Sequence, residues 1–282
     1  MLDLIKKLEP LHLGVVTPDS FALRGILQGI PDNDWKVQYF RSGEAWNGWT
    51  VPNEWLGFVQ SPEEYKSPLS APMYSLPFQG TVTGAELKRH AFVHGGIPNA
   101  VPYHCDWWYK PWKRDWGVCM TQTQRDKIED ARSYEVSVVT SEGPGDMNVF
   151  TWDLPGESPT TIVLQAHTCH PHQANDDLSG IAVGVKVMQE LCRKKRRLSY
   201  RLLLCPEHFG TIFYLRDKNA LENVRGVIFL ECLGAGSDTL KLQESFIGHG
   251  PLEQAFDHAV LLRRIDAGAQ GGVQYHFGFH YL

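Results

Sequence analysis

Residues 160–210 read TTIVLQAHTCHPHQANDDLSGIAVGVKVMQELCRKKRRLSYRLLLCPEHFG, and they set the architecture of the chain. Two short apolar runs, 161–166 and 202–205, have the length of buried strands. Between them, residues 178–194 begin with small residues and continue with apolar side chains at helical spacing. Because a strand, a helix and a second strand in this order place the strands parallel, both strands end at the same edge of one sheet.

The alternation of strands and helices continues through the second half of the chain. The sequence therefore predicts an α/β fold, namely an α/β/α sandwich with a mixed, mainly parallel sheet. Sheets of this kind bind ligands at the carboxyl ends of their strands. The expected strands are 160–166, 199–205, 225–232 and a short one near 240, and the expected helices are 178–194, 209–218 and 251–262.

The first half opens with two predicted helices. Apolar residues recur at helical spacing over 2–12, and a second helix begins after Asp19, a residue type favoured at the N-cap. KVQYF at 36–40 alternates like a strand. Residues 134–142 and 147–156 also alternate, and the turn residues GPGD between them predict a hairpin.

The composition changes between residues 31 and 116, which hold eight of the nine tryptophans and nine of the seventeen prolines. Prolines at this density exclude long helices and central strands, apart from a short helix capped by Thr83. We expect residues 45–132 to form an inserted, Trp- and Pro-rich β domain. Residues 1–44 and 133–282 would form the main α/β domain. The tryptophans would pack in the core of the inserted domain, or Trp107, Trp108 and Trp112 would line a substrate cleft.

The bulk composition narrows the class of partner. A net charge of −5 over 282 residues gives no electrostatic reason to expect nucleic acid or an anionic membrane. No apolar run approaches the length of a membrane span, and the first residues do not resemble a secretory leader. The six cysteines include no CxxC pair. We therefore expect a cytoplasmic protein.

Ligand-type side chains follow three successive predicted strands. His167 ends the first, Glu207 and His208 follow the second, and Glu231 ends the third. Asp176 lies where the loop returns to start the helix, so its carboxylate could bridge two metal ions. A hydrolytic zinc site needs imidazole and carboxylate ligands, and a further carboxylate to take a proton from water. Of the neighbours Glu207 and His208, one can serve as base and the other as ligand.

Other side chains of the same loop leave alternatives open. One of His170 and His172 could be a ligand or a hydrogen-bond donor to one, and Cys169 and Asp177 are further candidates for either role. Cys169 with His170 could instead be a thiol nucleophile and its base.

The order of these residues resembles a known family. A histidine, Asp-Asp-x-Ser-Gly at 176–180, a glutamate at a strand end and an acidic residue closing the next strand resemble the co-catalytic zinc aminopeptidases. HTCHPHQANDDLSG at 167–180 is closer still to a bacterial branch of aminopeptidase-like proteins, often linked to polysaccharide biosynthesis, with an inserted β-rich domain. The resemblance extends to 42–55, 102–119 and 153–158.

This resemblance implies a phosphorylase/hydrolase-like catalytic domain, one or two zinc ions and hydrolysis of a peptide or amide bond. By matching position, His167 is a terminal zinc ligand, Asp176 the bridging carboxylate and Glu207 the general base. His208 stands where the peptidases carry a glutamate ligand, and Glu231 where they carry an aspartate.

Besides His208 and Glu231, the sequence departs from the family pattern at two further places. Cys169 replaces the aspartate that orients the first histidine. The family also has a later ligand histidine, for which His276 and His280 are the candidates in this chain.

The resulting hypothesis is a zinc-dependent hydrolase of aminopeptidase type, in which Glu207 activates water for attack on an amide carbonyl. Its partner would be a peptide or an amide-bearing small molecule, with neither nucleic acid nor membrane, and a homo-oligomer is allowed. The alternative is a catalytically impaired or truncated relative that binds a glycan or peptide through the Trp-rich domain.

Overall fold

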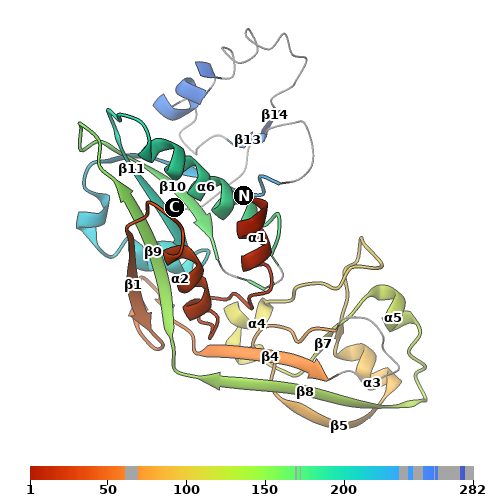
Figure 1. Ribbon diagram of the computed structural model, residues 1–282. Coiled ribbons are helices and arrows are strands. Elements are labelled where there is room, and N and C mark those ends of the chain that lie inside the picture. Colours follow the sequence, from red (N-terminus) through yellow and green to blue (C-terminus); the bar gives the residue numbers. More distant parts are fainter. Residues whose placement is uncertain are drawn as a thin grey trace.

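The protein is represented by a computed structural model, shown in Figure 1. The structure describes residues 1–60, 69–168, 170–171, 173–234, 241–243, 250–256, 258–259 and 274–276.

A five-stranded mixed sheet forms the centre of the molecule, with the order β1-β9-β11-β10-β12. The neighbours β11, β10 and β12 are parallel, whereas β9 runs antiparallel to both β1 and β11. The predicted α/β class with a mixed sheet is confirmed. The strands are β1 (Trp35–Arg41), β9 (Asp146–Leu154), β10 (Thr161–His167), β11 (Ser199–Cys205) and β12 (Val224–Phe229).

Alternating side chains of these strands divide between two buried faces. In β11, Leu202 and Leu204 face one apolar cluster, while Leu203 and Cys205 face another. The first cluster is completed by α1 (Leu2–Leu8), α2 (Ser20–Gln28) and α6 (Leu178–Cys192), which Figure 1 shows grouped on one side of the sheet. The second is completed by α7 (Phe209–Tyr214) and by aromatic residues from the 45–132 segment.

A second, three-stranded antiparallel sheet lies to one side of the main sheet in Figure 1. Its order is β4 (Glu54–Gln60), β8 (Ser133–Gly143) and β5 (Phe78–Thr83). The predicted hairpin of 134–142 with 147–156 is wrong, because β8 pairs with β4 and β5 while β9 pairs with β1 and β11. The GPGD turn therefore links two different sheets. The small sheet takes a strand from beyond residue 132, and the division at 45–132 stays a prediction.

Short elements complete the segment around the small sheet. Thr83 accepts a hydrogen bond from the Glu86 amide and caps α3, which confirms the predicted capped helix. These elements are β2 (Ala45–Trp46), β3 (Trp49–Thr50), α3 (Gly84–Arg89), β6 (Ala91–Phe92), α4 (Asp106–Tyr109), the 3-10 turn η1 (Pro111–Lys113), β7 (Val118–Cys119) and α5 (Gln122–Asp126).

Several predicted elements end earlier than the apolar pattern suggested. The first helix stops at Leu8, ahead of Pro10, because the residue before a proline is disfavoured in helices. Helix α7 stops at Tyr214, and Asp217 then caps the 3-10 turn η2 (Lys218–Leu221). The third parallel strand ends at Phe229, so Glu231 lies two residues beyond it.

The last described segments are short. Strand β13 (Lys241–Gln243), expected near residue 240, pairs in parallel with β14 (Gln274–His276), and residues 251–256 and 258–259 are helical. The remainder of the helix expected at 251–262 lies outside the described residues. No helix in the described part of the chain is long and apolar enough to cross a membrane.

Candidate metal centre

Three predicted ligands meet at the carboxyl edge of the main sheet. His167 is the last residue of β10, Asp176 precedes α6, and Glu231 follows β12. His167 Nε2 lies 2.8 Å from Asp176 Oδ1 and 3.4 Å from Glu231 Oε1. One ligand-type atom from each of the three side chains lies within 4.8 Å of the other two. The parallel strands bring these residues together, as the sequence predicted.

His167 and Asp176 form the inner part of this group. The His167 side chain is only 2% exposed, whereas Asp176 is half exposed. Hydrogen bonding to His167, and then to His170, holds the pKa of Asp176 well below its usual range. The carboxylate is therefore ionised at neutral pH, which is the state that binds a metal ion.

Asp177, the next residue, has a different environment. It is fully buried, and its carboxyl accepts hydrogen bonds from the backbone amides of His167, Gly180 and Cys232. Burial is the main reason that its pKa rises to about 7. The peptide bond between Asp176 and Asp177 is cis.

The start of α6 approaches the sheet closely. A Cβ at Gly180 would collide with the Leu230 carbonyl oxygen and with the Asp177 carboxyl, so only glycine fits there. The prediction that small residues allow this close approach is confirmed.

The segment after β12 turns sharply beside the three ligands. Cys232 has a positive φ of 52°, and the pKa of its thiol rises to about 11, mainly because of burial. Ser179 Oγ accepts from the Leu233 amide at 2.8 Å, and Asn175 Oδ1 accepts from the Gly234 amide at 2.6 Å. The sequence pattern did not predict these two contacts, although the ANDDLSG motif contains both acceptors.

Glu207 and His208 follow β11 at the same edge, because Cys205 pairs with His167 in the register of the sheet. His208 Nε2 lies 3.9 Å from Glu207 Oε1, and its Nδ1 lies 3.5 Å from the Tyr109 hydroxyl. Among the described residues, the three-ligand group does not include His208. Its role as a ligand, like that of Glu207 as base, stays a prediction.

His208 occupies a tight turn between the strand and α7. Its φ and ψ are 58° and −68°, and the Phe209 amide donates to the Glu207 carbonyl across it at 2.7 Å. This is a γ-turn of the strained kind. Trp49 and Trp108 pack against the Phe209 ring, at centroid distances of 4.8 Å and 5.4 Å. Neither the turn nor this aromatic contact was predicted, and the aromatic contact joins segments far apart in the sequence.

The remaining candidates fall into three groups. His170 lies 3.7 Å from Asp176 Oδ2 through its Nε2, and its ring stacks on Tyr103 at 5.0 Å. Trp107 and Trp108 are buried, as packing requires, whereas Trp112 is 75% exposed. Cys169, His172 and His280 lie outside the described residues, and His276 is described only as part of β14.

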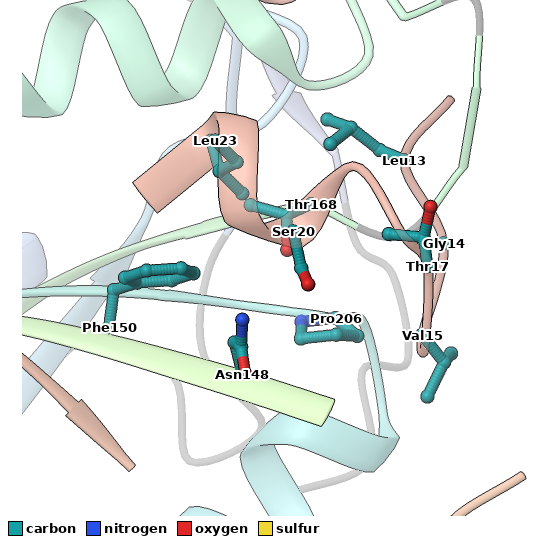
Figure 2. Close-up of a pocket in the computed structure, with 10 residues that line it drawn as sticks. All are labelled: Leu13, Gly14, Val15, Thr17, Ser20, Leu23, Asn148, Phe150, Thr168 and Pro206. Atoms are coloured by element: carbon teal, nitrogen blue, oxygen red, sulfur yellow. The ribbon is translucent and has the colours of Figure 1, made fainter. Parts of the chain in front are cut away.

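A small pocket lies beside the centre, on the α2 side of the same edge (Figure 2). None of the three converging side chains lines it. Asn148 reaches into it, and the Asn148 Oδ1 atom has no hydrogen-bond partner among the described residues. The lining residues are Leu13, Gly14, Val15, Thr17, Ser20, Leu23, Asn148, Phe150, Thr168 and Pro206.

Known proteins similar to this chain share this architecture. A Clostridium acetobutylicum protein, named for polysaccharide biosynthesis and an aminopeptidase-like domain, is 31% identical over 209 residues, covering 71% of this chain. The chain spans about half the length of that relative, 47%. A crystal structure from the same organism, described as a peptidase, has a TM-score of 0.82 at 25% identity and covers 98% of this chain and 65% of its own.

A zinc aminopeptidase and a further peptidase share the fold at lower identity. The Bacillus subtilis zinc aminopeptidase has a TM-score of 0.60 at 12% identity, over 96% of this chain and 83% of its own. A peptidase M28 precursor from Shewanella amazonensis has a TM-score of 0.59 at 12% identity, over 98% and 78%. The resemblance to the aminopeptidase-like family is confirmed. The family described as a domain of unknown function, DUF4910, matches residues 3–269, and the chain belongs to that family within the aminopeptidase-like fold.

Proposed function

We propose that this protein is a zinc-dependent hydrolase of aminopeptidase type that cleaves a peptide or amide bond. The observation that carries the proposal is the convergence of His167, Asp176 and Glu231 within 4.8 Å at the edge where α/β sheets bind ligands. The aminopeptidase-like fold and the name of the Clostridium relative support the same class of reaction.

The donor set fits zinc. One imidazole and two carboxylates are typical zinc ligands, and ligands at 2.0–2.2 Å from a tetrahedral ion lie about 3.4 Å from each other. The His167–Glu231 contact of 3.4 Å is close to that spacing, and the His167–Asp176 contact of 2.8 Å is shorter. The buried Glu231 Oε2 atom also lacks a hydrogen-bond partner among the described residues, as expected for a ligand atom.

Each residue has a distinct part in the proposed reaction. A zinc ion bound here would supply Lewis-acid polarisation of the substrate carbonyl and would lower the pKa of a water molecule. Glu207 would accept a proton from the attacking water on a carboxylate oxygen and pass it to the leaving amine. His167, Asp176 and Glu231 would hold the metal, and His208 is the candidate for a fourth ligand.

The aromatic side chains of the 45–132 segment would set specificity. Trp49 and Tyr109 lie against His208, and Tyr103 lies against His170, so this segment contacts two further candidate residues at this edge of the sheet. The substrate class we propose is a peptide N-terminus or an amide on an aminosugar.

A second candidate function is binding without catalysis. It is favoured by Trp112, which is 75% exposed, and by the partly exposed Tyr103 and Tyr109 rings, since aromatic faces stack on sugars and on peptide groups. Such a protein would bind a glycan or peptide and would not turn it over.

The Glu207→Gln variant separates the two functions. If Glu207 is the base, turnover of aminoacyl p-nitroanilides or N-acyl aminosugars should fall by about 10²–10⁴-fold while bound zinc is unchanged. Glu142→Gln is the matched control, because the Glu142 carboxylate accepts hydrogen bonds from Arg114 and Asn53, and neither of these is a candidate ligand. Equal turnover in Glu207→Gln and wild type would contradict the assignment. Ligand binding in a protein that hydrolyses none of these substrates would favour the second function.

A further inference from the structure

Asp177 has an unusual set of partners for a buried carboxyl group. Its side chain is 0% exposed, and no lysine or arginine pairs with it among the described salt bridges. Instead it accepts three backbone amides: Oδ2 from His167 at 3.1 Å, and Oδ1 from Gly180 at 3.2 Å and Cys232 at 3.3 Å. A carboxylate so deeply buried is costly unless its hydrogen bonds serve the fold or a site.

These partners come from three elements, and each of them borders a candidate ligand. His167 is itself a ligand and ends β10, Cys232 follows Glu231 after β12, and Asp177 follows Asp176 at the start of α6. The Asp177 carboxyl is therefore tied to all three candidate ligands. It bonds to the amide of His167 itself, it belongs to the residue after Asp176, and it bonds to the amide of the residue after Glu231. Its hydrogen bonds link the end of β10, the start of α6 and the segment after β12, where the hydrogen bonds of the sheet no longer hold the backbone.

The backbone beside Glu231 needs such a restraint. Strand β12 has ended two residues earlier, and Cys232 adopts a positive φ of 52°, which is unfavourable for a residue with a side chain. The Cys232 amide donates to Asp177 at this turn, while Ser179 and Asn175 hold the next two residues. The backbone that carries Glu231 beyond β12 is therefore held by hydrogen bonds to residues at and just before the start of α6.

We propose that Asp177 is a positioning residue that sets the spacing of the His167, Asp176 and Glu231 side chains before a metal ion binds. The inference rests on the proposed zinc site, and it concerns how the site is built rather than which reaction it performs. It predicts that losing the Asp177 carboxyl weakens metal binding even where the fold survives, because a site that must be assembled by the ion binds it less tightly.

Two variants test the proposal with zinc itself as the probe. Asp177→Asn keeps the shape of the side chain but turns one acceptor into a donor that faces a backbone N–H. Asp177→Ser can still cap α6 through Gly180 but is too short to reach His167 and Cys232 as well. The zinc dissociation constant, measured by competition with a chelator, should rise by about 10–100-fold in both variants. Glu142→Gln, which makes the same carboxylate-to-amide change next to Arg114, should bind zinc like wild type.

Folding and metal binding are distinguished in the same experiment. Each variant is first checked in the metal-free state by circular dichroism and cooperative thermal unfolding. If Asp177→Asn does not fold, Asp177→Ser decides the outcome. Wild-type zinc affinity in a folded Asp177 variant would overturn the proposal. Absence of zinc binding by the wild type would overturn the proposed function instead.

Hydrogen exchange in the metal-free wild-type protein gives a test that needs no variant. The amides of His167 and Cys232 should be protected from exchange before zinc is added, because Asp177 already accepts both of them. Rapid exchange of both amides without zinc, followed by protection once zinc binds, would show that the ion builds the site and would overturn the proposal.

Discussion

At the scale of single residues, the candidate centre depends on small side chains as much as on ligands. Gly180 lets the first turn of α6 approach Leu230 and Asp177, which brings the Asp176 carboxylate toward His167. The sequence predicts which side chains are candidate ligands, and it also shows a glycine at the start of the helix. The contact that requires the glycine involves Leu230, which lies just beyond β12 and fifty residues away, and only the structure shows it.

Gly180→Ala should destabilise the protein by about 1–3 kcal/mol, because the added methyl group meets a backbone oxygen that cannot move aside. The measurement is the free energy of unfolding in urea. Gly25→Ala is the control, since Gly25 lies in α2 with no atom near its missing Cβ. That variant should gain about 0.4–1 kcal/mol. Equal effects at the two positions would contradict the close approach.

The Arg114–Glu142 pair provides a pH-dependent prediction. Hydrogen bonds from Arg114 hold the pKa of Glu142 below its ordinary value of 4.5. A lowered carboxyl pKa means that the stabilisation is present above pH 4.5 and is lost as the pH falls through the folded-state value. Wild type should therefore exceed Glu142→Gln by about 0.5–1 kcal/mol at pH 7, discounted for partial exposure. A difference in unfolding free energy that stays constant from pH 7 to pH 3 would contradict this.

At the scale of elements, the turn between β11 and α7 is a place where the 45–132 segment packs against the part of the chain that forms the main sheet. His208 adopts a strained turn there, and the neighbouring Phe209 ring is covered by Trp49 and Trp108 from the 45–132 segment. Strain of this kind persists only where surrounding contacts hold it. We expect substitutions in the turn and in its aromatic contacts to change the free energy of unfolding.

A pair of substitutions tests the strained turn. His208→Gly should be about 1 kcal/mol more stable than His208→Ala, because glycine adopts a φ of 58° without steric cost. The opposite order is expected at Thr211 inside α7, where glycine is the poorer helix former by about 1 kcal/mol. Chemical denaturation of the four variants gives both differences, and the same sign at the two positions would refute the turn.

The aromatic cover has its own test. Phe209 is 5% exposed between the two tryptophans, so Phe209→Ala should cost about 3–5 kcal/mol. Phe58 in β4 is 49% exposed, and Phe58→Ala should change the unfolding free energy by no more than about 0.5 kcal/mol. Thermal and urea unfolding would show this contrast, and a loss of under 1 kcal/mol at Phe209 would argue against the packing.

The hairpin predicted from residues 134–156 is wrong because local sequence does not determine which strands pair. GPGD is a favourable turn, and both flanking segments do form strands, β8 and β9. However, β9 is buried along most of its length and pairs on both sides, with β1 and β11, while β8 pairs with β4 and β5. Local turn chemistry predicts that the chain reverses or bends, but long-range burial decides which strands pair.

At the scale of the whole molecule, most of the predicted fold and site came from one continuous stretch, residues 160–210. The strand, helix and strand of residues 160–210 occur where the apolar pattern placed them, because buried parallel strands and their crossover helix are locally encoded. The convergence of His167, Asp176 and Glu231 followed from that topology. The placement of the aromatic segment over α7 did not, since it depends on packing between distant parts of the chain.

The zinc content of the purified protein tests most directly whether these three side chains form a zinc site. Elemental analysis after equilibration with zinc and removal of the free ion should give one or two ions per chain. His167→Ala should lose them, because that imidazole contacts both carboxylates. A wild-type protein that retains no zinc and takes up none on titration would contradict the account.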